Sequence, residues 1–298
     1  MKFLGLILCL FVPLSVYAHE NHDEEAQPIY QMIPAAIEQA RAKITKDGAY
    51  LKITSNGIPN HQTGQFPNSD NPNAIQAQNH EYRVAASPHK AGRVTQMRGQ
   101  PFGVAINGIP FDPGTAECYG QQRGGRPGNM AVCEWREEAI VNGRGQLGLD
   151  SSNAHVQPDG TYHYHGIPNG LVLSVPSNND LIMVGYAADG FGVYVSKSAR
   201  FKPSYQLKPG TRPSGPGGHY SGKYTQDYTY IAQSGDLDEC NGYSDASGNY
   251  AYILTKDFPF IPRCWVGTPD ESFERQPLNS GGRQSREGRR PPPPRHRY

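Results

Sequence analysis

The sequence has no excess of charge of either sign. It carries 28 Lys and Arg against 27 Asp and Glu, a formal net charge of +1 in 298 residues. A protein that binds nucleic acid through its phosphates needs a basic surface, and the composition supplies no basic excess from which to build one. We therefore expect no nucleic-acid partner.

Long hydrophobic runs are also lacking after the first 18 residues. Lys2 precedes an apolar run from Phe3 to Leu14, and the small residue Ala18 follows. This pattern is typical of an export signal cleaved after Ala18, and the run is shorter than the roughly 20 residues of a membrane span. We expect a secreted or periplasmic protein with a signal peptide over residues 1–18 and no membrane span.

Cysteine is scarce, and Cys9 lies inside the predicted signal. The four that remain are Cys118, Cys133, Cys240 and Cys264. In an oxidising compartment two disulfides are the default, and four cysteines allow three pairings. We favour Cys118 with Cys133 and Cys240 with Cys264, because each pair encloses one Gly-rich or Tyr-rich loop. A four-thiolate zinc site is disfavoured because the chain has no C-x-x-C pair.

Glycine, proline and tyrosine are plentiful. The chain has 34 Gly and 26 Pro, about a fifth of all residues, together with 18 Tyr and 10 Phe. Short β-prone runs lie between turn residues. We expect a mainly β fold, a single loop-rich antiparallel domain of sandwich or barrel-like form, with one or two short helices over residues 34–46 and 135–141. The predicted extended runs are residues 50–54, 82–85, 102–106, 171–175, 181–187, 191–195, 224–231 and 250–254.

The predicted domain organisation follows from these patterns. Residues 19–48 are read as a polar segment with the first short helix, and residues 49–274 as the β domain. Residues 275–298 are rich in Arg and Pro and show no apolar periodicity, so we expect a disordered tail.

The tetrapeptide Tyr162-His163-Tyr164-His165 is the strongest chemical signal in the chain. In a strand, side chains alternate between the two faces, so both imidazoles would lie on one face and both tyrosines on the other. Two rings so placed can bind one ion at about 2.0–2.1 Å, and imidazole suits Zn, Cu, Fe or Ni. The alternative is that the histidines are polar neighbours of the tyrosines and bind no metal.

His155 lies eight residues before His163, with Pro158 and Gly160 between them. A hairpin turn there would return His155 to the same face and build a three-histidine site with one open position. The alternative is a loop histidine bonded to the backbone. Asp189 is either a turn residue that caps its own backbone or a site residue, as fourth ligand, orienting acceptor or proton acceptor.

Other candidate residues are weaker. His61 and His219 are possible accessory ligands, although loop positions are the ordinary interpretation of both. A terminal His19 could bind copper together with His22 or a strand histidine. An acidic loop contains three carboxylates that could bind calcium, Asp236, Asp238 and Glu239. The alternative is that this loop binds no ion and is only anchored by a disulfide.

The tetrapeptide and its flanks resemble the YHYH domain family of exported proteins. Asp189-Gly190-Phe191 is similar to the same family, although the chain then reads GVYV where the family usually has Pro, an aliphatic residue, Tyr and Gly. The resemblance covers roughly residues 50–273 and implies no assigned activity. Further similar stretches are residues 55–61 (SNGIPNH), 107–113 (NGIPFDP), 235–242 (GDLDECNG) and 258–264 (FPFIPRC).

Two classes of function are compatible with these features. The first is an exported metal-binding protein with a His-x-His site for Zn or Cu, whose candidate activities are those of a metal-dependent hydrolase or a redox enzyme. The second is a non-catalytic binding or structural protein whose Tyr-rich β surface takes a small molecule, glycan or peptide. The sequence has no H-E-x-x-H, G-x-S-x-G or phosphate-loop motif, so it does not decide between them.

Overall fold

The computed structural model describes residues 40–120 and 133–275. The predicted signal peptide, His19, His22, the first part of the predicted helix and residues 276–298 of the predicted tail lie outside these ranges. No helix among the described residues is long and apolar enough to cross a membrane.

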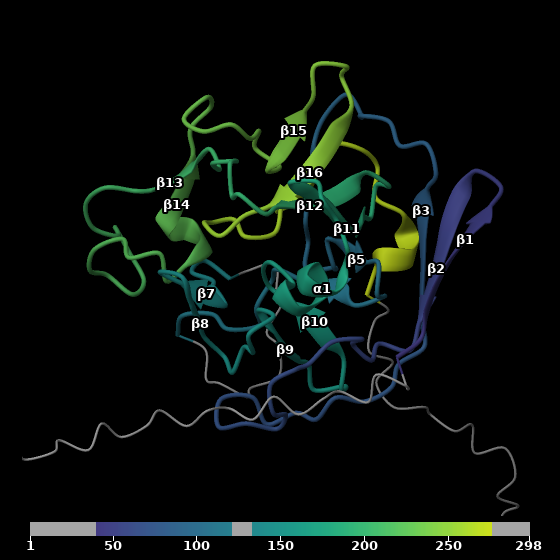
Figure 1. The fold of residues 1–298 in the computed structure, drawn as a ribbon. Coiled ribbons are helices and arrows are strands. Elements are labelled where there is room, and N and C mark those ends of the chain that lie inside the picture. Colours follow the sequence, from purple (N-terminus) through teal and green to yellow (C-terminus); the bar gives the residue numbers. More distant parts are fainter. Residues whose placement is uncertain (1–39, 121–132, 276–298) are drawn as a thin grey trace, which may run out of the picture. The chain divides into compact units, whose positions relative to one another are not determined.

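An eight-stranded sheet carries most of the fold (Figure 1). Its strand order is β15-β16-β12-β11-β5-β6-β10-β9, a row that does not close into a barrel. Most neighbours are antiparallel, as predicted, but β10 pairs with β6 and β12 pairs with β16 in parallel. The strands are β5 (Gly103–Ala105), β6 (Pro110–Phe111), β9 (Ala154–Val156), β10 (Tyr162–Tyr164), β11 (Leu181–Ala187), β12 (Gly192–Ser196), β15 (Gly242–Ser244) and β16 (Tyr250–Leu254).

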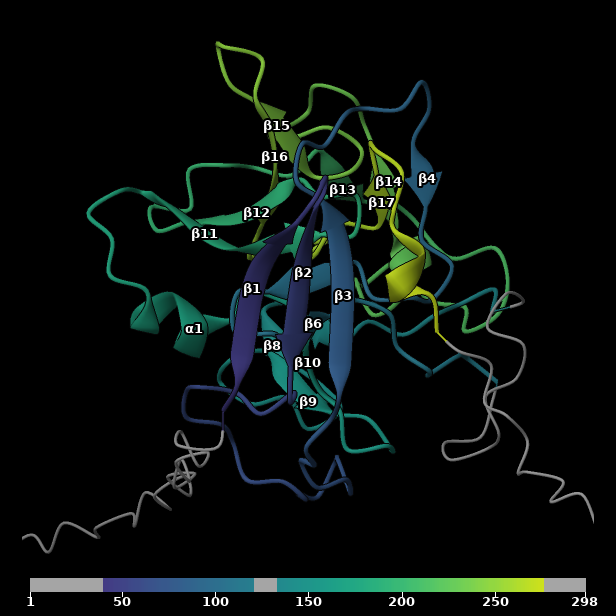
Figure 2. The same cartoon turned by 90° about the vertical axis from the view of Figure 1, so that its right-hand side faces the viewer.

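A three-stranded antiparallel sheet packs against this row (Figure 2). It consists of β1 (Ala42–Asp47), β2 (Tyr50–Ser55) and β3 (His80–Ala85). Residues 42–46 were predicted to be helical, and this prediction is wrong. Gly48, at φ +58°, allows a two-residue turn that pairs Asp47 with Tyr50, and β-branched Ile44 and Thr45 suit the resulting strand.

The predicted helix over residues 135–141 is also wrong. Arg136 and Glu137 form isolated bridges with Cys118 and Tyr224, so pairing with distant segments outweighs the local pattern. Ile140–Val141 is strand β7, paired with β8 (Arg144–Gly145).

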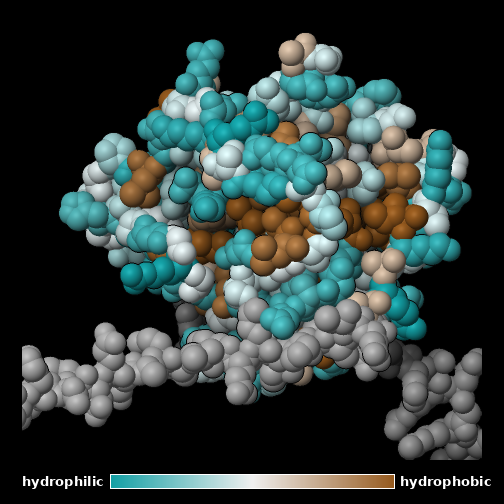
Figure 3. Space-filling model, viewed as in Figure 1, coloured by the Kyte–Doolittle hydropathy of each residue, from teal (hydrophilic) through white to brown (hydrophobic). Residues whose placement is uncertain are grey.

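The only α-helix among the described residues is α1 (Asn169–Ser174), where an extended run was predicted over residues 171–175. It begins directly after Pro168, whose carbonyl accepts the amide of Val172 at 2.9 Å. Leu171 is buried, whereas Leu173 is 87% exposed. Figure 3 shows hydrophobic residues gathered on the face of the molecule seen in Figure 1.

The remaining elements are short. Tyr224–Ile231 was predicted as one extended run, but its first part is a 3₁₀ turn and only Tyr228–Tyr230 is strand. The short elements are two strand pairs and two 3₁₀ turns: β4 (Thr95–Gln96) with β17 (Cys264–Trp265), β13 (Tyr205–Leu207) with β14 (Tyr228–Tyr230), η3 (Thr225–Asp227) and η4 (Glu271–Phe273).

The hydrophobic core lies between the two sheets. Ile53 and Val84 of the three-stranded sheet join Val104, Phe111 and Tyr164 of the larger sheet in one buried cluster. All five are fully buried, so this interface holds strand β10 in place from its tyrosine side.

Both predicted disulfides are present. Cys118 pairs with Cys133 across Cα atoms 5.9 Å apart, and Cys240 pairs with Cys264 across 5.1 Å. The prediction that each bridge closes one local loop is confirmed.

Candidate metal centre

The hairpin β9–β10 positions the candidate site. Its turn needs Gly160, which adopts φ +88° and donates its amide to the carbonyl of Gln157 at 2.9 Å. Asp159 accepts the amide of Thr161 at 3.0 Å and closes the turn. The resulting register places His155 opposite His163, as the hairpin reading of the sequence predicts.

Strand β10 presents different chemistry on its two faces. Tyr162 and Tyr164 point into the core, where the hydroxyl of Tyr162 donates to Asp150 at 2.7 Å. His163 and the adjacent His165 lie on the opposite face, and both are 2% exposed. The alternation of Tyr and His is therefore an alternation between a structural face and a histidine face.

Three imidazoles meet on the histidine face. The Nε2 atom of His165 lies 2.9 Å from that of His163 and 3.1 Å from that of His155. The ring centroids form a nearly equilateral triangle with sides of 4.7, 4.7 and 4.8 Å. Among the described residues, these three are the only group of His, Cys, Asp or Glu side chains arranged to hold a metal ion.

Backbone carbonyls orient two of the rings. The Nδ1 atom of His163 lies 3.1 Å from the carbonyl of Thr161, and that of His155 lies 2.8 Å from the carbonyl of Leu147. A carbonyl only accepts hydrogen bonds, so both Nδ1 atoms carry the proton and both Nε2 atoms present lone pairs to the centre.

Burial favours the neutral form of all three rings. Desolvation is the largest cause that lowers the pKa of His155, and it holds the pKa values of His163 and His165 well below the usual value. Repulsion between the neighbouring histidines adds to the effect on His163 and His165, and Arg275 and Arg263 make smaller contributions to His163 and His165 respectively. Neutral imidazole is the form that binds metals.

His61 belongs to the tyrosine face. Its Nδ1 lies 2.8 Å from the carbonyl of Gln62, and its Nε2 lies 2.6 Å from the hydroxyl of Tyr164. Asn107 donates to the same hydroxyl at 3.0 Å, so the Tyr164 proton is directed to His61. His61 thus supports β10 from the side opposite the three histidines.

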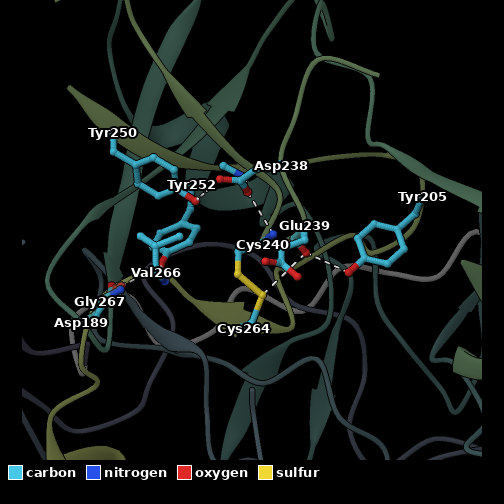
Figure 4. The surroundings of a disulfide bond; sticks show 11 residues. Asp189, Tyr205, Asp238, Glu239, Cys240, Tyr250, Tyr252, Cys264, Val266 and Gly267 are labelled. Carbon is cyan, nitrogen blue, oxygen red and sulfur yellow. Dashed lines mark hydrogen bonds between the residues drawn. A yellow bond between two sulfur atoms is a disulfide. The ribbon is translucent and has the colours of Figure 1, made fainter. Parts of the chain in front are cut away.

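Asp189 is also outside the centre. Its carboxylate accepts the hydroxyl of Tyr252 at 2.6 Å and the amide of Gly267 at 2.9 Å (Figure 4). Burial raises the pKa of Asp189, and these hydrogen bonds oppose the shift. The structure gives this residue a bracing role between β16 and the segment after β17, and it does not bring Asp189 to the histidines.

The remaining accessory candidates do not gather either. His219 is exposed and bonds the carbonyl of Gly210. Asp238 accepts two backbone amides and the Tyr250 hydroxyl, while Asp236 accepts the amide of Lys202 (Figure 4 shows Asp238). The carboxylates of Asp236 and Asp238 therefore have different partners, and the acidic loop is not among the groups of described side chains arranged to hold a metal ion.

Three residues beside the histidines were not identified from the sequence. Gln157 donates its side-chain amide to the buried carboxylate of Asp112 at 2.8 Å, and Arg275 forms an ion pair with the same carboxylate. Asp112 lies in the stretch NGIPFDP, but its position beside β10 depends on the parallel pairing of β6 with β10, which no local pattern indicates.

Comparison with known proteins gives a family and no close relative. The family model described as YHYH protein matches residues 81–267, within the span of the resemblance noted from the motifs. Neither the curated proteins nor the solved structures yielded a match. The matched segment holds β10 and the three histidines and covers more than half of the chain, and the chain therefore belongs to the YHYH family.

Proposed function

We propose that this protein is an exported metal-binding protein in which His155, His163 and His165 bind one transition-metal ion through their Nε2 atoms. The observation that carries the proposal is the convergence of three Nε2 atoms, from two buried histidines and one partly buried histidine. Two of these atoms are obliged by their hydrogen bonds to present lone pairs. Ligating histidines commonly donate their other ring N–H to a backbone carbonyl, as His155 and His163 do here.

Counting protons supports a cation at this point. His165 contacts both neighbouring Nε2 atoms but, as a neutral ring, can donate a proton to only one of them. In the other contact, two Nε2 lone pairs then face each other with no proton between them, and they repel. Protonating a ring would relieve the repulsion, but burial opposes the added charge. A metal ion satisfies all three nitrogens at once.

The arrangement of the rings favours zinc. Three ligands on one side of a tetrahedral ion at about 2.05 Å have nitrogens about 3.3 Å apart, a few tenths of an ångström more than the two close Nε2 distances. The planes of the three rings are inclined to one another by 62°, 62° and 88°, around a near-threefold axis. Copper(II) prefers square-planar ligands and fits this arrangement less well.

Such a site leaves one position for a water or a substrate. A bound zinc ion lowers the pKa of its water ligand to about 7 and so supplies a nucleophile for hydrolysis. His155 is partly exposed, whereas His163 and His165 are buried, so contact with solvent is on the side of His155. We therefore propose hydrolysis as the reaction, with copper redox chemistry as the alternative if copper is the bound ion.

Elemental analysis tests the proposal. The protein should be produced in an oxidising compartment, dialysed, and compared with His163→Ala plus His165→Ala. We expect about one equivalent of metal, lost in the double variant. His80→Gln is the matched control, because His80 is a mostly buried histidine of β3 whose pKa burial also lowers. A wild-type protein that takes up no Zn²⁺ or Cu²⁺ would contradict the proposal.

A second candidate is a non-catalytic binding protein. Leu207, Tyr230 and Ile231 on and beside strands β13 and β14 are 46%, 36% and 44% exposed, an apolar rim suited to a glycan or peptide. Glycan-array or peptide-array binding abolished by Tyr230→Ala, with the metal content unchanged, would favour this candidate.

A further inference from the structure

An ion pair lies on the same face of the sheet as the three histidines. Phe111 of β6 is the register partner of Tyr164 of β10, and their ring centroids are 5.8 Å apart, so both side chains share the tyrosine face. Asp112 follows Phe111 and extends the ladder by donating its amide to the carbonyl of Tyr164 at 2.9 Å. Its carboxylate therefore lies on the histidine face.

Gln157 shows where this carboxylate sits. Gln157 follows His155 by two residues and continues the β9–β10 ladder, donating its amide to Thr161 at 2.9 Å. Its side chain reaches Asp112, which is on the far side of β10. The bond between Gln157 and Asp112 consequently crosses β10 on the histidine face, next to His163.

Arg275 completes the pair from the end of the described chain. The side chain of Asp112 is 2% exposed, and that of Arg275 is 46% exposed. Among the described residues, Arg275 makes one side-chain hydrogen bond, from Nη2 to Asp112. A guanidinium has five N–H donors, so most of them remain directed away from Asp112.

Arg263 is a second cation on this side of the histidines. It donates to the carbonyl of Pro113, the residue after Asp112, at 3.1 Å. Arg263 is bound to Glu138 at 2.7 Å and is only 18% exposed, so Arg275 is the solvent-facing cation beside the histidine face.

We propose that Arg275 recognises an oxyanion, a carboxylate or phosphate group, on the molecule that binds at the histidine centre, and that this group competes with Asp112 for the guanidinium. The planar fork of Arg matches both kinds of group with two parallel hydrogen bonds. This inference rests on the proposed metal site and adds to it the chemical class of the substrate.

The test uses the full-length protein loaded with Co²⁺, whose visible spectrum reports ligands at the metal. Uptake of Co²⁺ is measured first, and its failure contradicts the metal site itself. Acetate and phosphate are then titrated as probes, with imidazole as a neutral ligand. The tighter of the two oxyanions indicates which group the natural substrate carries.

We expect opposite effects from the two halves of the ion pair. Arg275→Gln should weaken oxyanion binding about tenfold, the size expected for losing a hydrogen bond to a charged group, and leave imidazole binding unchanged. Asp112→Asn should strengthen oxyanion binding severalfold, because it removes a competing negative charge. Arg83→Gln is the matched control, since Arg83 is 45% exposed and paired with Asp270 on the three-stranded sheet.

Two results would overturn the inference while leaving the metal site intact. One is an oxyanion affinity that Arg275→Gln changes less than twofold. The other is equal weakening by Arg275→Gln and Asp112→Asn, which would mean that the pair only fastens the chain at Arg275. Should Asp112→Asn fail to fold, Arg275→Gln decides alone, because Arg275 is half-exposed at the edge of the described fold.

Discussion

His155 and His163 are register partners in hairpin β9–β10, and their ring centroids lie 4.7 Å apart. Paired residues of an antiparallel ladder present their side chains to the same face, so the turn that sets this register also assembles the centre. His165 follows His163 by two residues and so lies on the same face, and its amide continues the ladder by donating to the carbonyl of Asn153 at 2.7 Å. The geometry of one turn thus controls three possible ligands.

Gly160→Ala should therefore weaken both the fold and metal binding. Its φ of +88° disfavours any side chain, and an added Cβ would approach Cβ of Gln76 to 2.5 Å. We expect a loss of about 1–3 kcal/mol in the free energy of unfolding, measured by urea denaturation. Gly248→Ala is the control, because Gly248 has a similar φ of +84° but open space around it. Equal losses in both variants would refute the role assigned to the contact with Gln76.

Tyr162→Phe should destabilise the protein without removing a ligand. The variant loses the 2.7 Å hydrogen bond to Asp150, whose other oxygen accepts the amide of Ser152 and that of Ala154, the first residue of β9. A buried hydrogen bond to a charged group contributes about 1.5–3 kcal/mol. Thermal unfolding checks the loss, and Tyr230→Phe, at an exposed hydroxyl, should be nearly neutral. Metal stoichiometry that fell to zero in Tyr162→Phe would contradict the separation of the two faces.

The stability of the metal-free protein should fall as the pH drops below about 6.5. Burial lowers the pKa values of His155, His163 and His165, so below the unfolded pKa of about 6.5 the unfolded chain takes up protons that the folded state refuses. Each such histidine costs up to about 1.4 kcal/mol of folding free energy per pH unit until its folded pKa is reached.

Urea denaturation at pH 7.5, 6.5 and 5.5 measures this dependence. His61 and His80 also have pKa values lowered by burial, so they contribute to the same pH dependence. The part of the change in unfolding free energy with pH that comes from the centre is the part that His163→Gln removes. Excess Zn²⁺ should stabilise the protein at pH 7.5, and this stabilisation should shrink at pH 5.5 because protons then compete for the ligands. An unchanged slope in His163→Gln would show that the histidines outside the centre account for the effect.

Removing the bridge between Cys240 and Cys264 should lower stability and leave the centre intact. Closing a loop of 24 residues restricts the unfolded chain by an amount equivalent to about 3 kcal/mol. The double variant Cys240→Ala plus Cys264→Ala should therefore unfold at lower urea concentration yet bind the same amount of metal. The other bridge, between Cys118 and Cys133, closes a loop of 15 residues. The double variant Cys118→Ala plus Cys133→Ala should therefore show a similar loss in the free energy of unfolding. Loss of metal from the folded Cys240 and Cys264 variant would connect the bridge to the site.

The amino-acid sequence determined the local part of this protein. The alternation of Tyr and His, the Asp159-Gly160 turn and the eight-residue spacing to His155 place three imidazoles together, because strand periodicity and turn geometry act over a few residues. Most of the longer strands followed for the same reason. The favoured disulfide pairing followed instead from the loop that each pair of cysteines encloses, and the structure confirms it.

Only the tertiary structure decided what surrounds the histidines. It turned residues 42–46 and 140–141 from predicted helix into strand, and it separated Asp189 and His61 from the centre. It also brought Asp112 beside β10 through the parallel pairing of β6 with β10, two segments about fifty residues apart. Arg275 reaches the same place through its ion pair with Asp112. Such pairings depend on which faces are buried together, and that is a property of the whole packed chain which no short stretch of sequence contains.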